Sequence, residues 1–222
     1  MGPWSARQLA ALGAVAATIL LVIAFLLPGA PPKFDADSLK IVGFFHENHK
    51  KVLVSTVLGE IGIAILVGLI AQLAVVLRDS GHRAHAAVVG IAGAASVGSF
   101  AVGLGLFGGL GQLATFSHES SVVAPLYRLI QFVFTGFTWM TLVMVLTVAL
   151  AAWKGAFPQW VALANGGIAL LLLLAGISVK AQGAFAAGTG FFCVIGSIAF
   201  LVWVLHLAVL FWGKPQPAAA AA

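Results

Sequence analysis

The sequence predicts an all-α, polytopic membrane protein, a bundle of six transmembrane helices with a short interfacial helix between the first two. Of the 222 residues, 62% are hydrophobic and 8% are charged, whereas a soluble domain carries about 25% charged residues. Six apolar runs are each long enough to cross a hydrocarbon core of about 30 Å. The runs lack the two-residue alternation of a membrane barrel, so helices are the expected spanning structure.

The predicted spans follow one another with short connections and form one transmembrane domain, residues 1–214, before a low-complexity tail, 215–222. They cover residues 8–27, 52–77, 86–113, 128–152, 158–179 and 187–212. The first span follows a charged start, MGPWSARQ. Its apolar run of about 19 residues exceeds the 7–15 of a signal peptide, and PGAPPK after it is a poor cleavage site. We therefore expect a retained first helix.

The longest predicted connection, residues 28–51, contains the expected interfacial helix. Asp37 or Ser38 is a candidate N-cap. Leu39, Val42 and Phe45 then share one face at helical spacing. We expect that face to lie on the membrane interface and the helix to lead into the second span.

Charge indicates topology and contact with lipid headgroups. The net charge is +5 with a pI near 9.8, but the eleven Lys and Arg residues are scattered between apolar runs, so no nucleic-acid partner is expected. Counts of positive residues on the two sides do not decide the orientation. The compact basic turn LRDSGHR favours cytoplasmic termini. Cys193, the only cysteine, excludes an internal disulfide and a CxxC metal site.

The third span is rich in small residues, which let helix backbones approach closely in a membrane. Two stripes of small residues spaced four apart lie on it: Gly90, Ala94 and Gly98, then Ala101, Gly105 and Gly109. We expect this helix at the centre of the bundle. Its stripes serve either packing within the bundle or a smooth wall beside a ligand or a second subunit.

Glu60 is the one acid inside a predicted span. It belongs to a stripe of small and polar residues at four-residue spacing, Thr56, Glu60, Ala64, Gly68 and Gln72. The stripe predicts that Glu60 faces neighbouring helices, about 7 Å from the midplane. There it would be protonated, paired or beside a water-filled cavity. Gln112, Arg128 and Gln131 are its candidate partners in an outward polar pocket, and a purely structural hydrogen bond is the alternative.

The histidines permit two further interpretations. His46 and His49 share a face at helical spacing, and His118 lies in another loop on the same side. Together they are a candidate zinc or copper site, although loop histidines are ordinarily solvated. His206 lies inside the sixth span and is expected to hydrogen-bond Asn165 at similar depth. No second histidine lies deep enough for a bis-histidine haem, so no cofactor is predicted.

The sequence contains no catalytic motif such as GxSxG, a P-loop or paired acids. Its loop FFHENHKKVLVSTVLGE, the turn LRDSGHRAH, the glycine-rich third span and VIGSIAFLVWVLHLAVLFW resemble uncharacterised actinobacterial-type multi-pass membrane proteins with a domain of unknown function. That resemblance implies a bacterial inner membrane. The chain is also similar to the S components of energy-coupling-factor transporters, in which small-residue faces dock on a coupling subunit, as Ala10, Ala14 and Ala17 or the stripes of the third span would here.

Two functions follow as hypotheses. The first is a non-enzymatic accessory or sensing module whose glycine-rich helix faces pack against another membrane subunit or a second copy. The second is a small-solute binding or transport protein with a pocket around Glu60.

Overall fold

The structure, a computed structural model, describes residues 5–116, 120–178, 184 and 190–212. These residues form six α-helices and no strand, and each helix is long and apolar enough to cross a membrane. The predicted six-span, all-helical fold is thereby confirmed. The helices are α1 (Ala6–Leu26), α2 (Ser38–Asp79), α3 (Arg83–Phe116), α4 (Ser120–Trp153), α5 (Gln159–Gly176) and α6 (Phe191–Trp212).

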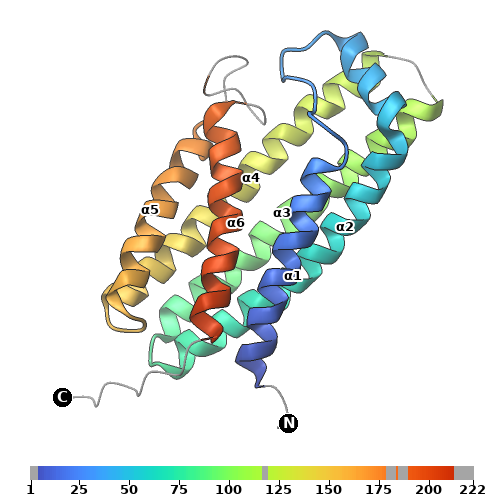
Figure 1. Ribbon diagram of the computed structural model, residues 1–222. Helices are drawn as coiled ribbons and strands as arrows, with labels where there is room; N and C mark the ends of the chain where they lie inside the picture. Colours follow the sequence, from blue (N-terminus) through green and yellow to red (C-terminus); the bar gives the residue numbers. More distant parts are fainter. Residues whose placement is uncertain (1–4, 117–119, 179–183, 185–189, 213–222) are drawn as a thin grey trace.

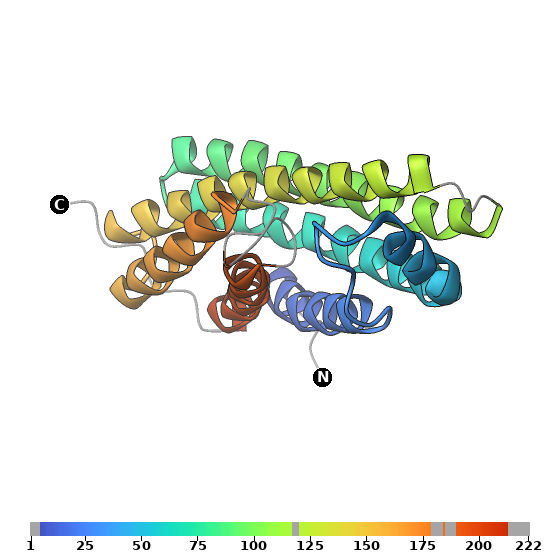
Figure 2. The same ribbon diagram turned by 90° about the horizontal axis from the view of Figure 1, so that it is seen from above.

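The helices form a closed ring (Figures 1 and 2). Each helix packs against the next one in sequence, and α6 packs against α1. A further contact joins α2 to α4. The prediction that the third span lies at the centre was wrong, because α3 packs against α2 and α4 and lies along one long side of the bundle (Figure 2). A ring leaves its middle to side chains instead of a central helix.

The helices differ greatly in length. Helix α2 has 42 residues and α3 and α4 have 34 each, whereas α1, α5 and α6 have 21, 18 and 22. At about 1.5 Å per residue, α2 is about 60 Å long, twice the hydrocarbon thickness. The three long helices therefore extend together past the short ones at one end (Figure 1).

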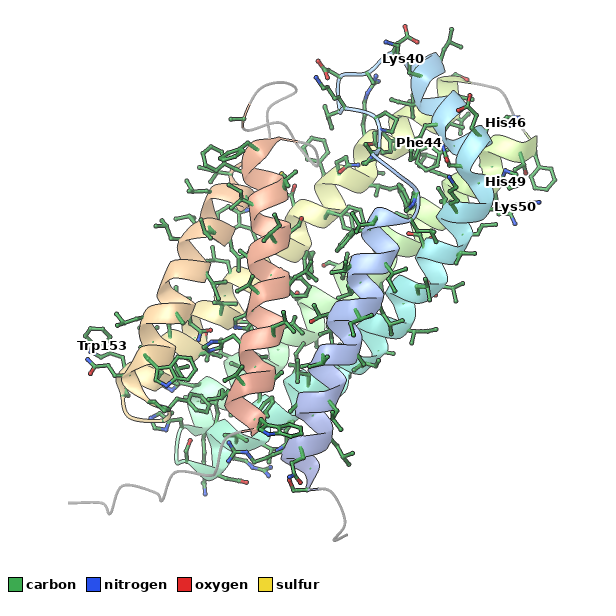
Figure 3. All side chains as sticks on the ribbon, in the orientation of Figure 1. Lys40, Phe44, His46, His49, Lys50 and Trp153 are labelled. Atoms are coloured by element: carbon green, nitrogen blue, oxygen red, sulfur yellow. The ribbon has the colours of Figure 1, made fainter. Side chains whose placement is uncertain are left out.

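This three-helix extension has its own apolar core. The core joins the start of α2, the end of α3 and the start of α4, through Ile41, Val42, Phe45, Val52, Leu110, Ala114, Val123, Ala124, Tyr127 and Ile130. Phe45 is fully buried and its ring lies 5.2 Å from that of Phe107 and 5.7 Å from that of Tyr127. Charged and polar residues of the same segment, among them Lys40 and Lys50, point away from it (Figure 3).

The predicted separate interfacial helix was wrong, although Asp37, one of its two candidate N-caps, does cap the helix. The Asp37 side chain accepts a hydrogen bond from the backbone N–H of Leu39 at 2.7 Å, and the helix then continues without a break into the second span. No proline lies between the cap and that span to end the helix. Val42 and Phe45 pack against α3 and α4 instead of lipid, while Leu39 is exposed.

Candidate functional site

The four residues predicted to form an outward pocket do not meet. The side chains of Glu60 and Gln112 are exposed, while that of Gln131 is buried. Arg128 donates hydrogen bonds to the carbonyl oxygens of Phe34 and Ala36, both at 3.3 Å, so its guanidinium holds the connection between α1 and α2. The contacts of Arg128 and the burial of Gln131 therefore give these four predicted residues different surroundings.

The side chain of Glu60 is exposed on α2 beside α3, so the prediction that neighbouring helices cover it was wrong. The buried side of α2 passes through Ser55, Thr56 and Gly59. A step of four residues turns the helix by about 40° beyond a full turn, which carries the side chain from buried Thr56 to exposed Glu60. The first residue of the stripe, Thr56, therefore lies in the α2–α3 contact, and the residues that follow it turn progressively away from that contact.

The carboxylate of Glu60 lies against α3. A Cβ built on Gly105 would be 3.9 Å from Oε1 of Glu60, with no other neighbour within 4 Å. Among the described residues the one ion pair joins Arg78 to Asp79, at 3.6 Å between Nε and Oδ1. No described cation therefore pairs with Glu60, which lies near the middle of α2 on the outside of the ring.

The glycines of α3 divide into two sets. A Cβ on Gly93, Gly103, Gly108 or Gly111 would come within 3.0 Å of a neighbouring side chain, so these glycines allow α3 to approach its neighbours closely. In the predicted stripes, by contrast, Gly90, Gly98 and Gly109 have nothing within 4 Å of that position. Ala94 is also exposed. Most residues of the stripes therefore face away from neighbouring helices, whereas Ala101 packs against the core. A different set of glycines packs the bundle.

Glu60, Gly98, Gly105 and Gly109 together define what we call the α2–α3 face. The three glycines lie within about 20° of one line along α3, given 100° per residue. The face is a shallow, glycine-lined surface with one carboxylate beside it. Of the three alanines predicted as a docking face on the first span, Ala14 and Ala17 are fully buried and Ala10 is half-buried.

The predicted metal site is not assembled by the residues that the structure describes. His46 Nδ1 lies 3.1 Å from the carbonyl oxygen of Ala114, and His49 Nδ1 lies 3.0 Å from the carbonyl oxygen of His46. Both lie on the N-terminal part of α2 (Figure 3). His118, the third predicted ligand, lies outside the described residues. No group of three His, Cys, Asp or Glu side chains comes together within the described ranges.

A buried polar cluster joins α5 to α6. Asn165 is fully buried, and its Oδ1 accepts a hydrogen bond from Trp203 Nε1 at 2.8 Å. Its Nδ2 donates to the carbonyl oxygen of Val161 at 2.8 Å and lies 3.3 Å from His206 Nε2. The predicted pairing of His206 with Asn165 is confirmed. The hydrogen bond from Trp203 to Asn165 was not predicted, because an indole N–H inside an apolar run gives no distinct sequence signal.

Sequence reasoning also missed a set of contacts at the other end of the ring. The Tyr127 hydroxyl donates to the carbonyl oxygen of Pro32 at 2.6 Å. The ring of Phe34 meets that of Phe132 edge to face at 5.7 Å. With the two Arg128 hydrogen bonds, these contacts hold the connection between α1 and α2 against the start of α4.

The fold and these surfaces define a multi-pass helical membrane protein. No protein-family model matches the chain, and no curated protein or solved structure matches it either.

Proposed function

We propose that the protein is a non-enzymatic accessory or sensing module of a bacterial inner membrane, with both termini in the cytoplasm. In this proposal it packs through the α2–α3 face against another membrane protein or a second copy of itself. The observation that supports it most directly is the exposed acid Glu60 on the outside of a span, beside glycines with nothing against them.

The cost of leaving that acid in lipid favours a covered face. An acidic side chain at the centre of a membrane helix costs about 2.5–3.5 kcal/mol on insertion scales. Lipid tails provide neither a hydrogen-bond donor nor a cation, whereas a second protein surface can provide both. Covering Glu60 therefore removes an unfavourable term that no described residue of this chain offsets.

The glycines supply the shape that such a contact requires. Apolar helices gain no hydrophobic advantage by leaving lipid, so their association depends on close backbone approach and interhelical hydrogen bonds. Gly98, Gly105 and Gly109 present backbone on one line of α3. A partner helix lying along that line would contact the carboxyl of Glu60 directly.

The test replaces glycines on and off the face. Gly98→Leu and Gly105→Leu place a bulky side chain where the partner would approach. Gly167→Leu, on the exposed side of α5 with nothing within 4 Å of its Cβ position, is the matched control. Native mass spectrometry of protein released from its own membrane in mild detergent should show a complex for the parent and for the control, and a lone protomer for both face variants.

Two outcomes would contradict the proposal. The first is a complex that survives both leucine substitutions on the face. The second is a parent protein released as a lone protomer. A Glu60→Gln variant adds a separate measurement, since an amide keeps the hydrogen bond and removes the charge. A complex that depends on an ion pair should be lost in this variant, and one that depends on hydrogen bonding should persist.

A further inference from the structure

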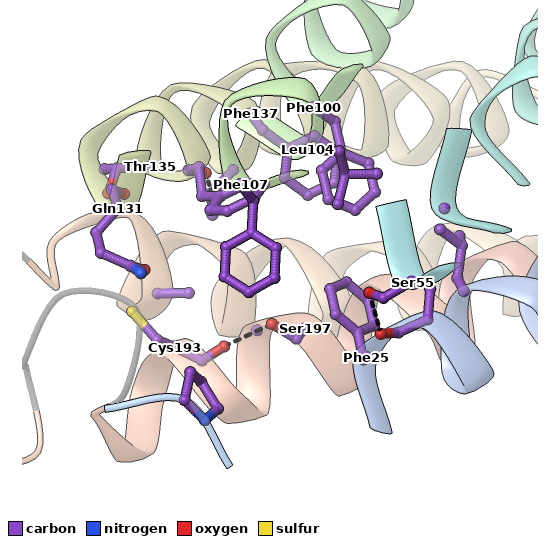
Figure 4. Close-up of a pocket in the computed structure, with 18 of the residues that line it drawn as sticks. Phe25, Ser55, Phe100, Leu104, Phe107, Gln131, Thr135, Phe137, Cys193 and Ser197 are labelled. Atoms are coloured by element: carbon purple, nitrogen blue, oxygen red, sulfur yellow. Dashed lines mark hydrogen bonds between the residues drawn. The ribbon is translucent and has the colours of Figure 1, made fainter. Parts of the chain in front are cut away.

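The ring encloses a cavity at the end where the α1–α2 connection lies (Figure 4). Its volume is about 200 Å³ and all six helices contribute to its wall. Protein interiors are close-packed and seldom leave a space larger than a water molecule. An engineered apolar cavity of about 150 Å³ admits benzene, so this space is large enough for one substituted ring.

The wall is mainly aromatic. Five phenylalanines line it, Phe25, Phe100, Phe107, Phe134 and Phe137. The rings of Phe100 and Phe137 stack with their centroids 4.5 Å apart, and Phe100 meets Phe134 edge to face at 5.7 Å. No charged side chain is among the described residues that line the cavity. A molecule that fits this wall is uncharged and presents an aromatic face or edge.

Most polar groups of the wall are already paired. The hydroxyl of Ser55 donates to a carbonyl of α1 at 2.6 Å, and the hydroxyls of Thr135, Thr138 and Ser197 donate to carbonyls of their own helices at 3.0–3.1 Å. Gln131 differs from them, because its amide points into the cavity toward Cys193 while the residue is only 7% exposed (Figure 4).

The Gln131 amide has hydrogen-bonding capacity left for a ligand. The Tyr127 hydroxyl, on the preceding turn, is a near neighbour of this amide. A primary amide carries two N–H donors and a carbonyl acceptor, so one hydroxyl neighbour leaves capacity for further hydrogen bonds. Tyr127 is in turn held by its hydrogen bond to Pro32. Tyr127 therefore lies on one side of the Gln131 amide, and the amide points into a cavity whose wall is mainly apolar.

The connection between α1 and α2 forms one wall of the cavity and is held in place by α4. Pro28, Gly29 and Pro31 line the cavity from the α1–α2 connection, and Tyr127 and Arg128 hold that connection to α4. The opposite edge is less closed, because Ser197 is exposed and Cys193 is half-buried. The site is therefore largely formed before a ligand arrives, as small-molecule pockets usually are.

We propose that this cavity binds an uncharged, single-ring aromatic molecule whose oxygen substituent, a phenolic hydroxyl or a ring carbonyl, hydrogen-bonds to the side-chain amide of Gln131. Such a molecule is soluble in the bilayer and needs no charged partner. The site lies inside the ring, whereas the α2–α3 face lies outside it, so this proposal does not depend on the first.

The test uses Cys193, the only cysteine of the chain, as a reporter in the wall. The rate at which N-ethylmaleimide alkylates Cys193 is measured by intact mass on the full-length protein in detergent, with 4-ethylphenol or ethylbenzene added. Both compounds should slow the reaction saturably. The half-saturating concentration should be about tenfold lower for 4-ethylphenol, a difference of about 1.4 kcal/mol.

Two variants separate the cavity from general effects of the compounds. Gln131→Met keeps the length of the side chain and removes the amide, so it should remove the preference for 4-ethylphenol. Thr135→Phe should fill the cavity and remove protection by either compound. Val143→Phe, at an exposed position of the same helix, is its control and should leave protection unchanged.

The proposal is overturned if neither compound protects Cys193, or if Gln131→Met retains the tenfold preference. Should that variant fail to fold, the parent protein alone decides, since equal protection by the two compounds also overturns the proposal. Copurification of a lipid acyl chain in the cavity, seen as a bound lipid mass that 4-ethylphenol does not displace, would overturn it as well.

Discussion

Two adjacent glycines of α3 are predicted to respond oppositely to the same substitution. A Cβ on Gly108 would lie 2.8 Å from Oγ1 and 2.9 Å from Cγ2 of Thr56, whereas a Cβ on Gly109 meets nothing within 4 Å. Carbon atoms pack best at about 3.5–4.0 Å. Gly108→Ala must therefore push α2 and α3 apart by about 0.6 Å or more, and Gly109→Ala requires no movement.

The expected difference in stability follows from this geometry. Overpacking a close contact costs about 1–3 kcal/mol. Both substitutions also gain helix propensity, up to about 1 kcal/mol over glycine, and this gain cancels when the two are compared. Gly108→Ala should thus be less stable than Gly109→Ala by about 1–3 kcal/mol, and Gly109→Ala should equal or exceed the parent.

The measurement is the midpoint of unfolding by sodium dodecyl sulfate in mixed micelles, followed by tryptophan fluorescence on the detergent-solubilised protomer. Thr56→Ala removes the clashing atoms and should suppress the effect of Gly108→Ala while leaving Gly109→Ala unchanged, which a double-mutant cycle detects. Equal stability of the two glycine variants, or no suppression by Thr56→Ala, would refute this account of the α2–α3 contact.

Three further predictions concern hydrogen bonds. Asn165→Leu should lower the free energy of unfolding by about 1–3 kcal/mol in the same assay, because Trp203 Nε1 loses its buried acceptor; an unchanged midpoint would contradict this. Tyr127→Phe removes the bond to Pro32, worth about 1 kcal/mol, and should raise hydrogen exchange in residues 28–37 about fivefold, with exchange elsewhere as the internal control. Ser55→Ala deletes the 2.6 Å bond to α1 and should cost about 0.6–1.7 kcal/mol, and a stabilised variant would show the bond to be dispensable.

The fold was largely predictable because span length is a strong constraint. A bilayer leaves no water to satisfy backbone groups, so each long apolar run must be a helix whatever its neighbours are. The predicted second span begins at residue 52, after the two lysines Lys50 and Lys51. The structure instead continues α2 back to Ser38. The partners that stabilise this segment come from α3 and α4, and an isolated pattern does not reveal them.

The site was less predictable, because a helical stripe does not determine which face a neighbour covers. Small residues occur on more than one side of α3, and only the packing shows that Gly108 is covered and Gly109 is open. Glu60 was placed on the wrong side for the same reason. Asn165 and His206 were paired correctly because two polar groups at one depth within apolar runs have few other partners.

The ring has a consequence for the order in which the protein is assembled. Of the six helix–helix contacts that close the ring, five join helices that are consecutive in sequence. Each of these five can form as soon as the later helix of the pair enters the membrane. The sixth contact joins α1 to α6, where Arg7 donates a hydrogen bond to the carbonyl oxygen of Leu210 at 3.2 Å. At about 5–20 residues per second, α1 waits roughly 10–40 s for α6 to be synthesised. During that interval one side of the first helix has only lipid, or an insertion factor, to cover it.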